Sequence, residues 1–128
     1  MTQEEAVKHW LESAERDFEV SKDMVQTNHR DWALFIGQLS LEKLLKGLVV
    51  KKTNQAPPFI HDLIKLSQLA GIEISIEQME QLAKITRFHV AARYVEIKSA
   101  LYKEATPEFT AEWMKKIGEF YLWFKKLY

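Results

Sequence analysis

Three long stretches of the chain place hydrophobic residues three or four positions apart, which is the spacing of one face of an α-helix. The first stretch runs from about residue 3 to Thr27, the second from Trp32 to about Lys52, and the third from Thr106 to the end of the sequence. No alternation of hydrophobic and polar residues typical of a strand competes with them. The sequence therefore predicts an all-α fold. The first repeat comprises Val7, Trp10, Leu11, Ala14, Phe18, Ser21 and Val25.

The middle of the chain is predicted to hold shorter helices separated by breaks. Two prolines in the segment 53–58 stop the second long helix. A short helix is expected over 61–70, with Gly71 as its stop. A further helix is expected over 75–89, whereas the pattern over 95–105 is the weakest in the chain. Because short connections favour antiparallel neighbours, the predicted architecture is an up-and-down bundle of four or five helices.

Residues that cap helices precede several of the predicted starts. The expected N-caps are Thr2, Asp31, Ser75 and Thr106. Thr2 and Ser75 are each followed three residues later by Glu or Gln, which is the pattern of a capping box. Thr106 precedes a proline, a residue favoured at the first position of a helix.

Two glycines, Gly37 and Gly47, lie inside the second long helix. Each costs up to about 1 kcal/mol relative to alanine in a helix. We interpret them as positions where a neighbouring helix approaches closely.

The composition is that of one globular domain spanning 1–128, with 47% hydrophobic and 28% charged residues. The chain has no cysteine, which excludes disulfides and thiolate chemistry. Its start lacks the features of a signal peptide and no stretch is hydrophobic enough to span a membrane, so a soluble cytoplasmic protein without membrane contact is expected.

The net charge is zero, with 18 basic and 18 acidic residues, so no broad nucleic-acid surface is expected. The charges are segregated, however. Residues 1–31 carry four basic and eight acidic groups, whereas residues 43–103 carry ten basic and five acidic groups. A local anion site in this basic middle segment remains compatible with a neutral chain.

Common catalytic and cofactor motifs are missing from the sequence. The histidines, at positions 9, 29, 61 and 89, form no pair four residues apart and no His-Glu-x-x-His motif. The glycines are too far apart for a phosphate-binding loop, and no serine lies in Gly-x-Ser-x-Gly. We therefore predict no metal ligands, no cofactor and no catalytic residue of these classes.

A sparse set of polar residues stands at unusual places and forms the candidate site. Three of them interrupt a hydrophobic helix, two follow the proline break, and two end another helical stretch. In that order they are Glu42, Lys43 and Lys46, then His61 and Asp62, then Arg93 and Tyr94. Structural explanations exist for several of them: an ion pair between Glu42 and Lys46, an N-cap at Asp62, and a hydrogen-bonded interior His61.

Taken together, the order of these residues resembles the HEPN family. The elements that carry the resemblance are an amphipathic helix with Trp10, Ala14 and Asp17, then Gln38 to Lys46, a proline-containing loop before His61-Asp62-Leu63, and Ala92-Arg93-Tyr94. The match covers roughly residues 4–127. It implies a helical bundle, often a homodimer, implicated in nucleotide binding. It also implies a minimal nucleotidyltransferase as a partner, in a two-component, toxin–antitoxin-like system.

Many HEPN proteins are ribonuclease toxins that carry an arginine, four to six residues, and then a histidine. None of the arginines at positions 16, 30, 87 and 93 has a histidine at that distance. Arg87 and His89 are separated by a single residue, which directs them to different sides of a helix. The chain thus resembles the non-cleaving branch of the family.

Three functions stay open on this reading. The first is a nucleotide-binding module whose phosphate contacts are Lys43, Lys46, His61, Asp62, Arg93 and Tyr94. The second is a metal-independent ribonuclease that uses Arg87 with His89, or Arg93 with His61. The third is a dimeric helical scaffold, since aromatic residues such as Trp113, Tyr121, Trp123 and Tyr128 cannot all face one side of the last helix.

Overall fold

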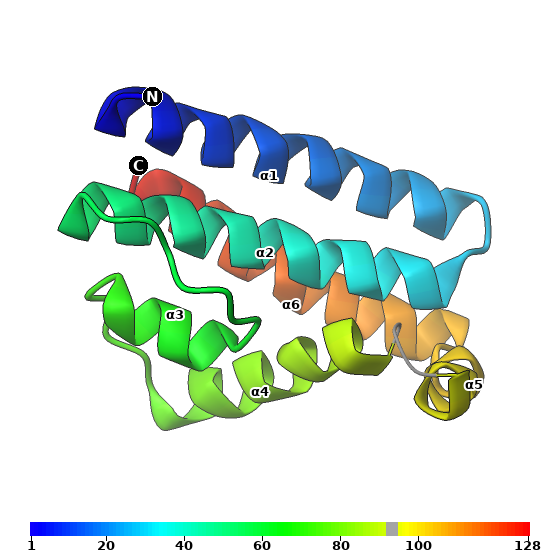
Figure 1. Ribbon diagram of the computed structural model, residues 1–128. Helices are drawn as coiled ribbons and strands as arrows, with labels where there is room; N and C mark the ends of the chain where they lie inside the picture. Colours follow the sequence, from blue (N-terminus) through cyan, green and yellow to red (C-terminus); the bar gives the residue numbers. More distant parts are fainter. Residues whose placement is uncertain (92–94) are drawn as a thin grey trace.

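The computed structural model describes the backbone of residues 1–91 and 95–128, and the side chains of residues 1–89 and 100–128. These residues form six α-helices and no strand, which confirms the predicted all-α fold (Figure 1). The helices are α1 (Gln3–Gln26), α2 (Arg30–Thr53), α3 (Leu63–Leu69), α4 (Ile76–Ala91), α5 (Val95–Glu104) and α6 (Pro107–Lys126).

Helix α2 is the centre of the bundle. It contacts each of the five other helices, and 15 of its 24 residues are buried. The hydrophobic residues of α2 lie on most of its sides, as expected of a helix that other helices cover all round. The four long helices α1, α2, α4 and α6 alternate in direction along the chain, so the up-and-down arrangement is as predicted (Figure 1).

Most of the predicted helix boundaries are confirmed. Thr2 forms a capping box with Glu5, and Thr106 accepts a hydrogen bond from the backbone of Phe109. The Ser75 hydroxyl and the side chain of Gln78 likewise exchange hydrogen bonds with each other's backbone N–H, at 3.1 and 2.9 Å.

The prediction that Asp31 caps the second helix is wrong. Helix α2 begins two residues earlier than predicted, at Arg30, and the N-cap position is taken by His29, whose side chain makes no capping hydrogen bond. The reason is Asn28, which adopts a left-handed backbone with φ 64° and reverses the chain within a very short connection. Asp31 therefore lies in the first turn, where a carboxylate still interacts favourably with the helix dipole.

Helix α3 is shorter than predicted, because Asp62 is its N-cap rather than part of it. The Asp62 carboxylate accepts hydrogen bonds from the backbone N–H groups of Ile64 and Lys65, at 3.0 and 3.2 Å. His61 consequently stands in the non-helical segment 54–62. The predicted stop at Gly71 is confirmed, since this glycine has φ +74°.

The acidic first helix pairs with basic residues of the same chain. Asp17 binds the ammonium of Lys43 in α2 at 2.7 Å, and Glu15 binds that of Lys125 in α6 at 2.8 Å. The segregation of charge along the sequence is thus used at the Asp17–Lys43 pair, whereas Lys125 lies outside the basic segment 43–103. Both ion pairs hold α1 against the rest of the bundle.

Both ends of the chain meet the C-terminal half of α2, at the same end of the bundle (Figure 1). The hydroxyl of Tyr128 donates to the carbonyl of Leu44 at 2.6 Å, and the side chain of Gln3 donates to the carbonyl of Val50 at 3.0 Å. The aromatic residues of α6 also pack within the chain: Tyr121 stacks on Phe18 with ring centroids 3.9 Å apart.

Candidate functional site

A row of polar side chains runs along one side of the buried helix α2. Gln38, Glu42 and Lys46 follow one another at intervals of four residues, which places them one above the other on the helix. They are only 0%, 3% and 7% exposed. Burying charged groups is costly unless they are paired and hydrogen-bonded, so the contacts of this row decide how it is tolerated.

Glu42 is the hub of these contacts. One carboxylate oxygen, Oε2, accepts from the ammonium of Lys46 at 2.9 Å. The other, Oε1, accepts from Nδ1 of His61 at 2.9 Å and from the side-chain amide of Gln38 at 3.2 Å. Burial by itself would raise the pKa of Glu42, but these hydrogen bonds and the charge of Lys46 outweigh it, so the pKa lies below its ordinary value. Glu42 is thus held as a carboxylate inside the bundle.

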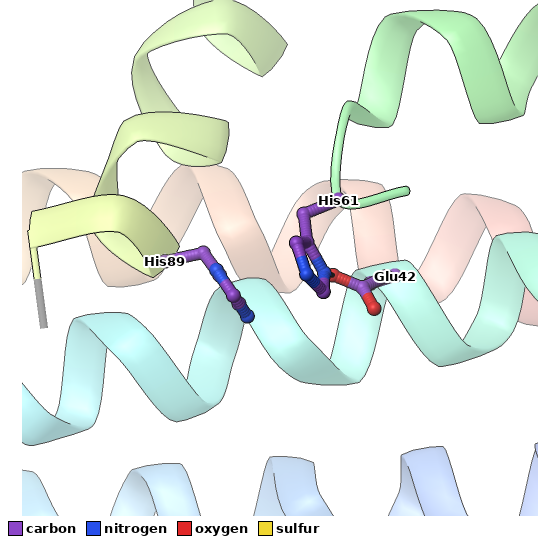
Figure 2. A group of neighbouring side chains, drawn as sticks. All are labelled: Glu42, His61 and His89. Atoms are coloured by element: carbon purple, nitrogen blue, oxygen red, sulfur yellow. Dashed lines mark hydrogen bonds and ion pairs between the residues drawn. The ribbon is translucent and has the colours of Figure 1, made fainter. Parts of the chain in front are cut away.

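Two histidines complete the cluster from other parts of the chain (Figure 2). His61 reaches Glu42 from the segment before α3, and the backbone carbonyl of His61 accepts a hydrogen bond from Gln38 at 3.3 Å. His89, near the end of α4, stacks its ring on that of His61, with centroids 3.8 Å apart and planes 19° apart. The His89 ring also contacts that of Phe35, with centroids 5.3 Å apart.

The cluster is open to solvent on one side. The side chain of His61 is 41% exposed, whereas that of Glu42 is 4% exposed and His89 as a whole residue is 6% exposed. A carboxylate can only accept, so Nδ1 of His61 carries the hydrogen that it donates. While this hydrogen bond to Glu42 holds, a further ligand of the imidazole would therefore be met by Nε2.

The structure brings some of the predicted site residues together and separates others. Lys46 and His61 both bind Glu42, and the predicted Glu42–Lys46 ion pair is confirmed. Lys43 instead turns to α1, where its ammonium contacts Asp17 and also donates to the Ser13 hydroxyl at 2.8 Å.

The remaining predicted site residues have separate roles or places. Asp62 is the N-cap of α3, which confirms the structural role predicted for it from the sequence. Arg93 and Tyr94 lie outside the described residues.

Sequence reasoning missed two members of the cluster. Gln38 was part of the matched sequence element, but no role was predicted for it. His89 was considered only with Arg87 as a cleaving pair. The signal for Gln38 is its spacing of four from Glu42 inside a hydrophobic helix. No comparable signal exists for His89, because its place beside His61 depends on how α4 packs.

This arrangement has three chemical capabilities. The exposed imidazole can hydrogen-bond an anion, the imidazole–carboxylate pair can exchange protons, and the two histidines with Glu42 offer nitrogen and oxygen ligands to a metal ion. A separate groove of about 570 Å³ lies at the C-terminal end of α2. It combines Lys51 and Lys52 with hydrophobic residues that include Ile72 and Trp123.

Comparisons with known proteins agree with the fold. The family model of the HEPN domain matches residues 7–127, which is nearly the whole chain. The crystal structure of TT1696 from Thermus thermophilus superposes with a TM-score of 0.76, at 18% sequence identity, over 94% of this chain and 96% of that one. No curated protein sequence matches. Among the described residues, no helix is long and hydrophobic enough to cross a membrane.

Proposed function

The chain belongs to the HEPN domain family, and we propose that it is a nucleotide-binding module, without catalytic activity of its own, that acts with a minimal nucleotidyltransferase in a toxin–antitoxin-like pair. The observation that carries this proposal is the position of His61. Its imidazole is half exposed to solvent and is held by a hydrogen bond to the buried carboxylate of Glu42. Glu42 and Gln38 fix its position, so the imidazole is preorganised toward solvent.

The proposed ligand contact is a phosphate group at Nε2 of His61, with Arg93 and Tyr94 as further contacts. A guanidinium offers a fork of donors suited to phosphate oxygens, and a tyrosine ring can stack on a base. Lys43 and Lys46 stay in the proposal as secondary contacts. To bind the ligand, Lys43 would have to leave the carboxylate of Asp17, and Lys46 would have to leave that of Glu42.

Isothermal titration calorimetry with ATP and ADP tests the proposal, in the presence of EDTA. We expect micromolar affinity for at least one nucleotide. His61→Gln and Arg93→Gln should each weaken it about 10-fold or more, since a hydrogen bond to a charged group contributes about 1.5–3 kcal/mol. His29→Gln, which changes an exposed histidine elsewhere, is the matched control. Absence of any binding heat would refute the proposal.

A variant of the groove at the C-terminal end of α2 tests whether the nucleotide binds there instead of at His61. A Lys51→Ala, Lys52→Ala double variant removes both of its ammonium groups. If that variant loses nucleotide binding while His61→Gln keeps it, the nucleotide binds in the groove and the assignment to His61 is wrong. If only His61→Gln loses binding, the assignment stands.

A second function, metal-independent ribonuclease, is favoured by one observation. The carboxylate of Glu42 orients the imidazole of His61, and a second imidazole, that of His89, lies directly beside it. Two such groups can act as general base and general acid toward a 2′-hydroxyl and a leaving oxygen. Cleavage of RNA in EDTA by the wild type, abolished by His61→Gln and retained by His29→Gln, would establish it. Intact RNA after incubation with the folded wild type would exclude it.

A further inference from the structure

We propose that Glu42, His61 and His89 together bind one divalent transition-metal ion of the zinc class. One ring nitrogen of each histidine and one oxygen of Glu42 lie within 4.8 Å of one another. The inference does not rest on nucleotide binding. It follows from the donor set: two imidazoles and one carboxylate are ligands of zinc sites in which a fourth position stays open.

One distance in the cluster is already close to that of a loaded site. Ligand atoms about 2.0–2.1 Å from a tetrahedral zinc ion lie about 3.3 Å from each other. Nδ1 of His61 and Oε1 of Glu42 are already 2.9 Å apart, so an ion between them would replace the hydrogen they now share. The ligand atoms of the cluster span up to 4.8 Å, and the rings of His61 and His89 are stacked, so these rings must turn out of their stacked arrangement for one nitrogen of each to face the same ion. His61 can follow because it belongs to a non-helical segment.

The surroundings of the three ligands fit a metal site in two respects. Metal-binding carboxylates are usually held by further hydrogen bonds, and Glu42 is held by Lys46 through its other oxygen. The side-chain oxygen of Gln38, whose amide nitrogen contacts Glu42, is buried and accepts no hydrogen bond from the described residues. A water molecule bound to the metal could donate a hydrogen bond to this oxygen.

The charge of the site indicates which ligand would occupy the fourth coordination position of the ion. Glu42 and Lys46 cancel each other, so a divalent ion adds net positive charge. Because the His61 side chain is 41% exposed, water or an anion can reach the open position from solvent. Two imidazoles disfavour magnesium and calcium, which prefer oxygen ligands.

The three ligands come from three separate elements: α2, the segment before α3, and α4 (Figure 2). A bound ion would therefore tie these elements together in the folded state alone. Ligands that bind only the folded state raise its stability. With Zn²⁺ at 100 times its dissociation constant, we expect the melting temperature to rise by about 10 °C.

The test uses protein stripped with EDTA and dialysed, without nucleotide. Calorimetry with ZnCl₂ should give one ion per chain, CoCl₂ should give the visible spectrum of tetrahedral Co²⁺, and MgCl₂ should leave the melting temperature unchanged. His61→Gln should weaken zinc binding at least about 100-fold, because loss of a ligand exceeds the 10- to 100-fold effect of losing a supporting residue. His29→Gln should bind as the wild type does.

Two results would overturn the proposal. One is folded wild-type protein that shows neither a binding heat nor a change in melting temperature with Zn²⁺. The other is zinc binding that His61→Gln leaves intact, which would place the ion elsewhere on the surface. Glu42→Gln and His89→Gln serve as further ligand variants when their melting temperatures without metal show that they fold.

Discussion

Replacing Gly47 by alanine should destabilise the protein, although alanine is the better helix former. A Cβ atom built on Gly47 would lie 2.8 Å from Cβ of Trp10 and 2.9 Å from Cζ of Tyr128, and it would also meet the Tyr128 hydroxyl. The Trp10 atom is attached directly to the backbone of α1, so relief requires α1 itself to move. Overpacking of this kind costs about 1–3 kcal/mol, against a helix-propensity gain of about 1 kcal/mol. The difference is a net loss of up to about 2 kcal/mol, and the fixed position of the Trp10 atom favours the upper part of that range.

Two other helical glycines are matched controls for this substitution. At Gly118 the nearest atom to a new Cβ is Cζ of Phe18 at 3.9 Å, an ordinary contact, so Gly118→Ala should stabilise by about 0.5–1 kcal/mol. At Gly37 the nearest atoms belong to side chains, Cδ1 of Ile117 at 3.0 Å and Oγ of Ser21 at 3.2 Å, and a shift of a few tenths of an ångström relieves both contacts without moving a helix. Gly37→Ala should therefore change stability little.

Urea unfolding followed by circular dichroism measures all three variants, and an unchanged m value shows that two-state comparison is valid. The reasoning is refuted if Gly47→Ala is as stable as the wild type, or if Gly47→Ala and Gly118→Ala shift the free energy of unfolding in the same direction. A Gly47→Ala, Tyr128→Ala double variant separates the two clashes. Because Trp10 remains, it should stay below Tyr128→Ala alone in stability.

Three further predictions concern caps, pH and assembly. Asp62→Ala should cost about 1 kcal/mol of stability in urea unfolding, whereas Asp62→Asn should cost little; equal losses would contradict the capping role. Burial raises the pKa of Tyr128, so above pH 10 the unfolded tyrosine ionises first and stability falls. Tyr128 should contribute a loss of about 1 kcal/mol between pH 10 and 11, so the loss in Tyr128→Phe should be smaller than that of the wild type by this amount. Light scattering should give about twice 15.1 kDa, with Leu122, which is 61% exposed on α6, as a seam residue; a monomer would exclude the homodimer.

The helices were predictable because their signals are local. A capping residue, a proline and a glycine at a positive φ each act within one or two turns, and Thr2, Thr106 and Gly71 behave as expected. Asp31 shows where such signals fail. Its predicted role as a cap depended on the length of the connection before it, which the left-handed backbone of Asn28 shortens.

The candidate site was predictable only in part, because its contacts are set by packing. Spacing along one helix sufficed to predict the Glu42–Lys46 ion pair. It did not separate Lys43 from Lys46, whose ammonium groups bind carboxylates on different helices. The place of His89 depends on the rotation of α4 about its axis and on its distance from α2, and neither follows from the periodicity of α4 itself.

Packing alone does not explain the polar row of Gln38, Glu42 and Lys46 inside the bundle. Helix α2 is buried on most sides, and hydrophobic residues at the positions of Gln38, Glu42 and Lys46 would fill the same space. Replacing a buried ion pair by hydrophobic residues of similar volume is often neutral or stabilising, so packing gives no reason for charges there. Glu42 and Gln38 do, however, hold His61 by hydrogen bonds, while part of its ring stays exposed to solvent. The proposed nucleotide contact and the proposed metal site both use this imidazole.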